Sequence, residues 1–161
     1  ATIFAKEPGK QNIFEKLQLD FLRETLVGAN IAQSVNKLPS SGPNQLFLED
    51  GHLVNKKSSE NLKNLDVEVI LVNGLSVYGT LKYTGDWFGG HQDNQKHDVM
   101  SCLQQHDLNT GVFIFAGVDG PYYHSERGKK NLEEFDYLLN PHLMVGSVAT
   151  LSEGMSIWAQ L

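Results

Sequence analysis

The sequence predicts one three-layer α/β domain over residues 1–161, with a central mixed sheet that contains an antiparallel hairpin and is flanked by helices. Three observations lead to this fold class. Helix-spaced apolar segments alternate with strand-like ones, and elements in that order pack as helices on a sheet. The run GVFIFAGV at 111–118 is continuously apolar, which is typical of a strand buried on both faces. A chain of 161 residues, 40% of them hydrophobic, is long enough to bury one core.

The first half of the chain contains one predicted helix and a long loop. Apolar residues recur at helical spacing across 11–27, and Gly28 can end this helix. Residues 38–63 are rich in Ser, Asn, Gly and Pro, which favours a loop around a short strand or hairpin, with 49–51 (EDG) as a turn. The helical spacing is carried by Phe14, Leu17, Phe21 and Leu22.

The second half alternates strands with helices. Two strands form the hairpin, and each later strand is preceded by a segment with helical character. The predicted elements are strands at 66–72 and 75–83, a helix from about 93 to 105, the buried strand 111–118, a turn at 119–123, a helix at 129–139 and a last strand at 142–151.

The turn of the hairpin decides which side chains share a face. A two-residue Asn73-Gly74 turn would place apolar residues of one strand beside polar residues of the other. A three-residue loop over 72–74, with Gly74 left-handed in a bulge, unites the apolar residues on one face. We therefore expect this loop, with Asp66 directly opposite Thr80. The polar face then carries Asp66, Glu68, Ile70, Ser76, Tyr78, Thr80 and Lys82.

Charge and cysteine content limit the partners and the compartment. With 13 Lys and Arg against 19 Asp and Glu, the net charge is −6, so a nucleic-acid surface must be local or belong to another module. Acids gathered around a divalent metal would give the same imbalance. Cys102, the one cysteine, lies in the apolar phase of a predicted helix, so we expect it to be buried and the compartment to be the reducing cytoplasm. No apolar run reaches the roughly 20 residues that span a bilayer and no signal segment opens the chain, so no membrane partner is expected.

Two short motifs on the hairpin carry a resemblance to a known family. Leu65-Asp66 looks like a PD element, and Thr80-Leu81-Lys82 occupies the place of a (D/E)xK element in the next, antiparallel strand. A polar helix and a buried strand follow. In this order of elements, over roughly residues 10–150, the chain resembles the PD-(D/E)xK nucleases, the superfamily of type II restriction endonucleases and of type IIS cleavage domains.

The resemblance implies a restriction endonuclease-like fold and a Mg²⁺-dependent endonuclease that hydrolyses double-stranded DNA. It implies catalytic roles for Asp66, Thr80 and Lys82, with Asp66 and Asp93 as metal ligands. Mg²⁺ prefers oxygen ligands, polarises the scissile phosphate and lowers the pKa of an attacking water. Because both strands must be cut, we expect a homodimer or a separate recognition domain or subunit.

Thr80 departs from the family pattern, which has an acid at this position. A hydroxyl is a poorer metal ligand than a carboxylate, so three interpretations are open. The acid has moved to the following helix as Asp93 or Asp98, or Glu68 or Glu15 completes the site, or the domain is inactive.

A non-catalytic binding domain is the alternative function. In that case the Trp-, Gly- and Asp-rich loop at 84–95 binds carbohydrate or protein, and the polar hairpin face is merely solvated. The compact basic stretch Ser125–Lys130 (SERGKK) also has two interpretations. It is either a solvated helix start or a contact for DNA phosphates.

Overall fold

The computed structural model describes residues 8–59, 62–83, 99–126, 128–130, 133 and 141–161. Five strands form one mixed sheet in the spatial order β1–β4–β5–β6–β7, so the predicted α/β class with a mixed sheet is confirmed. β1, β4 and β5 are antiparallel neighbours, whereas β5, β6 and β7 run parallel. The strands are β1 (Ala32–Lys37), β4 (Val67–Leu71), β5 (Ser76–Tyr83), β6 (Phe113–Asp119) and β7 (Leu143–Gly146).

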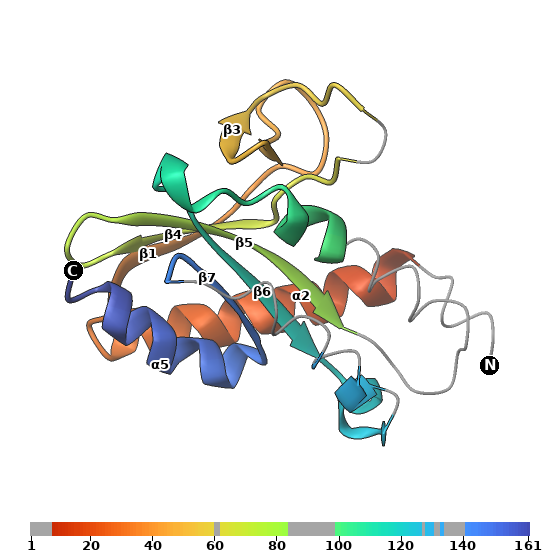
Figure 1. The fold of residues 1–161 in the computed structure, drawn as a ribbon. Helices are drawn as coiled ribbons and strands as arrows, with labels where there is room; N and C mark the ends of the chain where they lie inside the picture. The colour runs from red at the N-terminus through yellow and green to blue at the C-terminus, as the bar shows by residue number, and fades with distance from the viewer. Residues whose placement is uncertain (1–7, 60–61, 84–98, 127, 131–132, 134–140) are drawn as a thin grey trace.

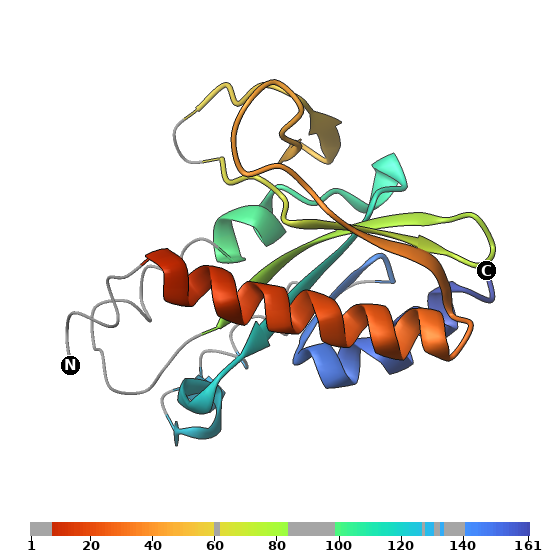
Figure 2. The same cartoon turned by 180° about the vertical axis from the view of Figure 1, so that it is seen from behind.

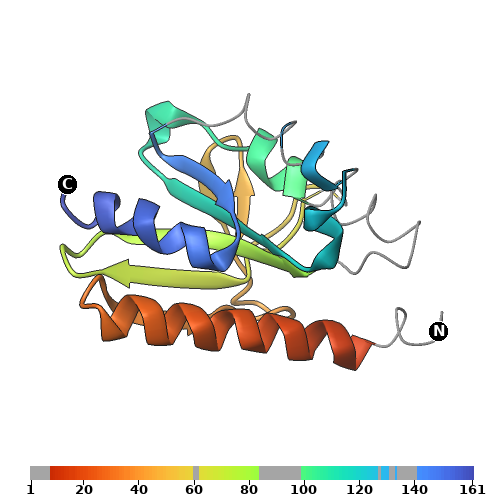
Figure 3. The same cartoon turned by 90° about the horizontal axis from the view of Figure 1, so that it is seen from below.

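Helices and a small second sheet cover the two faces of this sheet (Figure 1). One face is covered by α2 (Pro8–Leu22), which continues into the π-helical η1 (Arg23–Val27), and by α5 (Val148–Trp158). Figure 2 shows α2 running along the sheet from behind, and Figure 3 shows α2 and α5 side by side. The other face carries helical residues 99–104 and the antiparallel pair β2 (Phe47–Glu49) and β3 (His52–Val54).

Two apolar clusters fill the spaces between these layers. The first joins α2 and α5 to the apolar hairpin face, with Leu22 and Phe115 fully buried. The second lies on the opposite face and includes Leu103, Ile114 and Cys102. β6 contributes to both clusters, which confirms that this strand is buried on both faces. Cys102 is 6% exposed, as expected, and burial raises the pKa of its thiol to about 12.

The predicted N-terminal helix forms, but its apolar residues divide between two faces. Leu22 is completely buried and packs in the first cluster, together with Leu19 and Leu26. Leu17 is 59% exposed and Phe21 is 40% exposed. Helical spacing therefore predicted the element correctly, whereas the tertiary packing decided which of these side chains is buried.

The hairpin register agrees with the prediction. Val67 pairs with Gly79 and Val69 pairs with Val77, so the apolar residues share the face under α2 and α5. Gly74 has a φ of +88°, where a side chain would be strained, and its N–H donates to the Leu71 carbonyl at 2.9 Å. A three-residue loop therefore closes the hairpin.

Strand β1 was not predicted. Among its residues only Ala32 and Val35 are buried, and its pairing with β4 contains an irregularity between Ala32 and Ser34. An edge strand needs burial on one face only, and here the irregularity also breaks the period-2 alternation. The sequence of β1 therefore carries almost no strand signal.

The predicted last strand at 142–151 is wrong in its second half. β7 ends at Gly146, and α5 begins at Val148. The Ser147 hydroxyl accepts a hydrogen bond from the Thr150 N–H at 3.2 Å, which caps the helix. The buried positions of α5 recur at helical spacing and are Val148, Leu151, Met155 and Trp158.

The remaining predictions concern two turns and two helices, and parts of both helices lie outside the described residues. The EDG turn is confirmed, with positive φ at Asp50 and Gly51 between β2 and β3. The turn at 119–123 contains the 3₁₀ helix η3 (Pro121–His124), and a second, η2 (Leu108–Thr110), precedes β6. Of the predicted helices at 93–105 and 129–139, residues 99–104, 129, 130 and 133 are described, and they are helical.

Within the described part of the chain, every helix is too short or too polar to cross a membrane.

Candidate functional site

Asp66 occupies the fork where β4 and β5 separate. The ladder ends at the Val67–Gly79 pair, beyond which the Asp66 N–H donates to the Gly79 carbonyl at 2.8 Å. Beyond this bond, the acceptor for the donors of β5 is the Asp66 side chain and no longer the backbone of β4. Asp66 Oδ2 accepts hydrogen bonds from the Leu81 N–H at 2.8 Å and from the Thr80 hydroxyl at 2.9 Å. The fork therefore holds a carboxylate that two donors fix in place.

Thr80 lies opposite Asp66, as the register predicts, and only 4% of it is exposed. The hydroxyl is directed at the Asp66 carboxylate, so the residue that replaces the expected acid serves as a hydrogen-bond donor. This end of the polar face is therefore not a solvated surface, because the second cluster covers the sheet here. Tyr78, on the same face as Thr80, packs against that cluster.

Helix α2 brings Glu15 to the same place. Phe14 stacks on Tyr83 at the end of β5, with ring centroids 3.8 Å apart and an interplanar angle of 9°. One turn further along the helix, Gln18 Nε2 donates to the Lys82 carbonyl at 3.0 Å and to Asp119 Oδ2 at 2.8 Å. These contacts hold the helix against the ends of β5 and β6 on both sides of Glu15.

Electrostatic effects link Glu15 and Asp66 to two lysines. Burial raises the pKa of the Asp66 carboxyl, while the charge of Lys82, the hydrogen bonds at the fork and the charge of Lys37 lower it. Burial also raises the pKa of Glu15, the Asp66 charge raises it further, and Lys37 and Lys82 lower it. The site is thus a pair of desolvated carboxylates whose negative charges are partly balanced by two ammonium groups.

The residues fit a divalent cation. Burial raises the pKa of both carboxyls, and the Asp66 charge raises that of Glu15 further, so a nearby cation would stabilise their ionised forms. Mg²⁺ commonly takes one or two carboxylates and completes its shell with water and phosphate, and Glu15 and Asp66 are the two described carboxylates at this place that could serve. Within the described part of the chain, no group of three or more His, Cys, Asp or Glu side chains is placed to hold a metal.

A cavity gives access to Glu15 from the side of β1. Its volume is about 490 Å³, and it lies between α2 and the end of β1. Three cations, Lys16, Arg23 and Lys37, and two acids line its wall, and one of the acids, Asp20, lies 3.5 Å from the Arg23 guanidinium. The lining residues are Ile13, Glu15, Lys16, Leu19, Asp20, Arg23 and Lys37.

Of the other three candidate acids, Glu68 lies within the described residues, whereas Asp93 and Asp98 do not. Glu68 pairs with Tyr78 in the ladder. Burial raises the pKa of the Tyr78 phenol, and the charge of Glu68 and a hydrogen bond to it raise that pKa further. Its carboxylate is not among the charges that shift the pKa of Asp66. Asp93 and Asp98 lie outside the described residues, as does the loop at 84–95. Glu15 is therefore the described acid that accompanies Asp66.

Sequence reasoning missed three residues around the site. Lys37 was not predicted as a site residue, because β1, the strand that carries it, was not predicted. Gln18 and Asp119 join α2 to β6, and Asp119 Oδ2 also accepts from the Val148 N–H of α5 at 3.3 Å. Their partners are far away in sequence, so no local pattern could have indicated these contacts.

No protein-family model matches the chain, and no curated protein or solved structure is significantly similar to it. The function must therefore be inferred from the geometry of the site.

Proposed function

We propose that the protein is a Mg²⁺-dependent endonuclease that hydrolyses phosphodiester bonds in double-stranded DNA, with a fold of the restriction endonuclease type. The observation that carries this proposal is the Asp66 carboxylate, which hydrogen bonds from Thr80 and Leu81 hold in the strand fork. Its charge raises the pKa of Glu15, and the charge of Lys82 lowers the pKa of both carboxyls. Carboxylates can hold a metal ion that assists phosphodiester hydrolysis, and a lysine beside them can stabilise the charge that develops on the phosphate.

The order of elements supports the proposal. α2 leads into the antiparallel strands β1, β4 and β5, after which come helical residues 99–104 and the parallel strand β6. The PD-(D/E)xK nucleases likewise place an Asp at the start of one strand, the lysine triplet in the next antiparallel strand, and then a helix and a buried strand. Asp66 directly precedes β4, and Lys82 lies near the end of β5.

Glu15 and Asp66 would hold the metal. The ion, when bound, polarises the scissile phosphate and lowers the pKa of the attacking water. Thr80 and the Leu81 N–H fix the Asp66 carboxylate by hydrogen bonds to one oxygen, which keeps its orientation constant. Asp93, the ligand expected from the sequence, lies outside the described residues and stays a prediction.

Lys82 would supply positive charge to the phosphate. Its backbone is held by the hydrogen bond from Gln18, while its ammonium group is close enough to lower the pKa values of both Asp66 and Glu15. A preorganised ammonium group stabilises the negative charge that develops on phosphate oxygens in the transition state. Catalysis on both strands would be achieved by a homodimer or with a separate recognition module, in the cytoplasm.

The decisive experiment compares two isosteric variants on the same helix. Purified protein is incubated with plasmid DNA in Mg²⁺ or in EDTA, and nicked and linear products are quantified. We expect cleavage by the parent in Mg²⁺ only, near-complete loss in Glu15→Gln, and parent-like cleavage in Glu24→Gln, because Glu24 is exposed at the far end of the helical segment.

Absence of cleavage by the parent with Mg²⁺, Mn²⁺ or Co²⁺ would overturn the proposal and favour a non-catalytic binding domain, in keeping with Thr80 in place of an acid. Full activity of Glu15→Gln would instead remove Glu15 from the ligand set and leave the acids of the following helix as candidates. Melting temperatures of both variants establish that neither result reflects unfolding.

A further inference from the structure

The side-chain amide of Gln18 is buried between α2 and the carboxyl ends of β5 and β6. Only 5% of the residue is exposed. Its Nε2 donates to the Lys82 carbonyl at 3.0 Å and to Asp119 Oδ2 at 2.8 Å. Both partners are acceptors, so the nitrogen must lie on this side, because the opposite assignment would set Oε1 against two other oxygens. Oε1 therefore lies on the side of the amide that faces away from these acceptors.

The Gln18 Oε1 atom is a buried acceptor that takes no hydrogen bond from the residues that the structure describes. Buried carbonyl oxygens are nearly always satisfied, since an unsatisfied one loses its hydration and gains nothing in return. Ordered water or a bound ligand commonly completes such an acceptor. Gln18 can therefore accept one more hydrogen bond, and the donor must come from outside the described residues.

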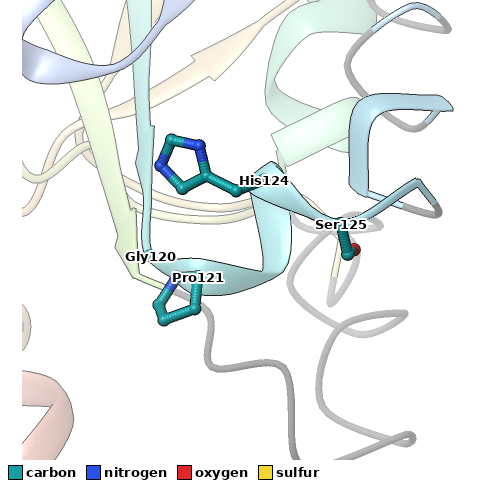
Figure 4. A pocket seen from close by; sticks show the side chains of 4 residues that line it. All are labelled: Gly120, Pro121, His124 and Ser125. Carbon is teal, nitrogen blue, oxygen red and sulfur yellow. The ribbon is translucent and has the colours of Figure 1, made fainter.

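The turn that follows β6 does not provide that donor. Asp119 ends β6, and the next residues line a cavity of about 570 Å³, with His124 and Ser125 as its polar side chains (Figure 4). The Ser125 hydroxyl accepts from a backbone N–H at 3.1 Å, and neither side chain donates to Gln18 Oε1. A donor for Oε1 must therefore come from another direction.

Glu15 lies beside Gln18 on the inner face of α2. Residues three positions apart on a helix are neighbours, and helical side chains lean toward the N-terminus, so the Gln18 amide lies over the turn that carries Glu15. Phe14, in the same turn, stacks on Tyr83. Tyr83 in turn pairs with Asp119, to which Gln18 donates. The Gln18 amide and Glu15 are therefore neighbours at the same end of the sheet.

The Gln18 amide is also linked to Asp66 through β5. Gln18 donates to the Lys82 carbonyl, and the Asp66 carboxylate accepts from the N–H of Leu81, the preceding residue. Successive Cα atoms are about 3.8 Å apart, so the two polar side chains are held by adjacent residues of one strand. A buried acceptor therefore lies next to the two carboxylates that fit a divalent cation.

We propose that Gln18 is a positioning residue whose Oε1 accepts a hydrogen bond from a water molecule bound to the Mg²⁺ ion that Glu15 and Asp66 would hold. The proposal rests on the proposed function, in which these two carboxylates leave most of the shell of the ion to water and phosphate. Water on a divalent cation is a strong hydrogen-bond donor, and an outer acceptor fixes its orientation. Gln18 contacts neither the ion nor the substrate, and it acts through the water.

The test measures Mg²⁺ binding without DNA and without cleavage. The midpoint of thermal unfolding is recorded as MgCl₂ is added, and its rise with concentration gives Kd, because the ion binds the folded state. Glu15→Gln should abolish the rise, which assigns the rise to this site. We expect Gln18→Met, similar in shape but without the amide, to weaken Mg²⁺ binding about tenfold, the lower bound for the loss of an outer hydrogen-bond partner. Gln160→Met, at an exposed glutamine after α5, is the matched control and should bind Mg²⁺ like the parent.

A second variant separates the two ends of the amide. Gln18→Glu keeps an acceptor in place of Oε1 and loses both hydrogen bonds from Nε2. It should unfold at a lower temperature than the parent and yet bind Mg²⁺ at least as tightly. An amide with a structural role alone predicts lower midpoints for both variants and parent-like Mg²⁺ affinity for Gln18→Met. Weaker Mg²⁺ binding by Gln18→Glu would overturn the proposal even if Gln18→Met did not fold.

The outcomes distinguish this proposal from the nuclease function. Parent-like Mg²⁺ affinity in Gln18→Met, or a parent whose midpoint does not rise with Mg²⁺, would overturn the role of Gln18. If that variant binds Mg²⁺ like the parent while the parent cleaves plasmid DNA, the role of Gln18 is refuted and the nuclease function stands. If the variant binds Mg²⁺ about tenfold more weakly while the parent never cleaves, the nuclease function is refuted and the contact with the bound water stands.

Discussion

The two ends of the β4–β5 hairpin complete their hydrogen bonding in different ways. At the closed end the Leu71 N–H donates to the Leu75 carbonyl at 2.8 Å, and the Asn73 amide accepts from the Leu75 N–H at 3.1 Å. Asn73 Nδ2 also donates to the Trp158 carbonyl at 3.0 Å. Every partner at this end is neutral, and each contact serves the turn or its packing against α5.

The open end uses a charged group where a neutral one would suffice. The Leu81 N–H is accepted by the Asp66 carboxylate, whose pKa burial raises, with a second acid, Glu15, brought close by α2. A neutral amide would satisfy the same donors without a desolvated charge. The closed end is therefore built for stability, whereas the open end gives up stability to keep two carboxylates together, which is expected of a functional site.

The largest expected effect is on catalysis at the open end. Lys82→Ala should reduce the single-turnover cleavage rate by roughly 10²–10³, or about 2.7–4 kcal/mol, because a positioned charge that stabilises the transition state is lost. DNA affinity should change much less, since one phosphate contact among several is removed. Lys56→Ala, an exposed lysine beside β3, is the control. Equal cleavage rates for Lys82→Ala and the parent would leave Lys82 without a catalytic role.

An intermediate effect is expected at the closed end, on stability alone. Gly74→Ala places a side chain at a φ of +88°, which costs about 1–2 kcal/mol. No atom lies within 4 Å of the added methyl group, so the cost is that of the backbone conformation. Urea unfolding should show this loss while cleavage at a temperature well below the midpoint stays unchanged. A loss of activity in the fully folded variant would mean that the two ends are coupled.

The smallest expected effect is a gain in stability at the open end. The folded pKa of Asp66 is raised above 3.8, so this carboxyl favours the folded state below about pH 4, and that contribution is lost as the pH rises through the folded pKa. Asn does not titrate, and its amide oxygen can accept both hydrogen bonds. Asp66→Asn should therefore gain stability relative to the parent as the pH rises from 4 to 7 in EDTA.

Urea unfolding at several pH values measures this difference, and Glu24→Gln, which removes the charge of an exposed acid of η1, controls for the change in net charge. Mg²⁺ should narrow the difference, because the ion stabilises the parent by binding only its folded state. If Asp66→Asn were less stable than the parent at pH 7 in EDTA, the carboxylate would contribute more to folding than its desolvation costs, and the contrast between the two ends would disappear.

Several features of the fold and the site could be predicted from the sequence because their causes are local. The period-2 alternation of Val67, Val69 and Leu71 against the later strand fixed the register, and with it the three-residue loop and the left-handed Gly74. From that register the position of Asp66 opposite Thr80 followed. The continuous apolar run of β6 was equally clear, because a strand buried on both faces needs apolar residues at every position.

The tertiary structure alone decided the rest. β1 is an edge strand with few buried residues, so Lys37 had no predicted place. The apolar residues at the start of α5 do not distinguish a strand from a buried helix, so the sequence predicts that β7 continues to residue 151. Glu15 was one of several candidate acids, and only the docking of α2 through Phe14 and Gln18 places it beside Asp66. The local pattern sets which face a side chain takes within its own element, whereas distance between elements depends on how their buried surfaces fit together.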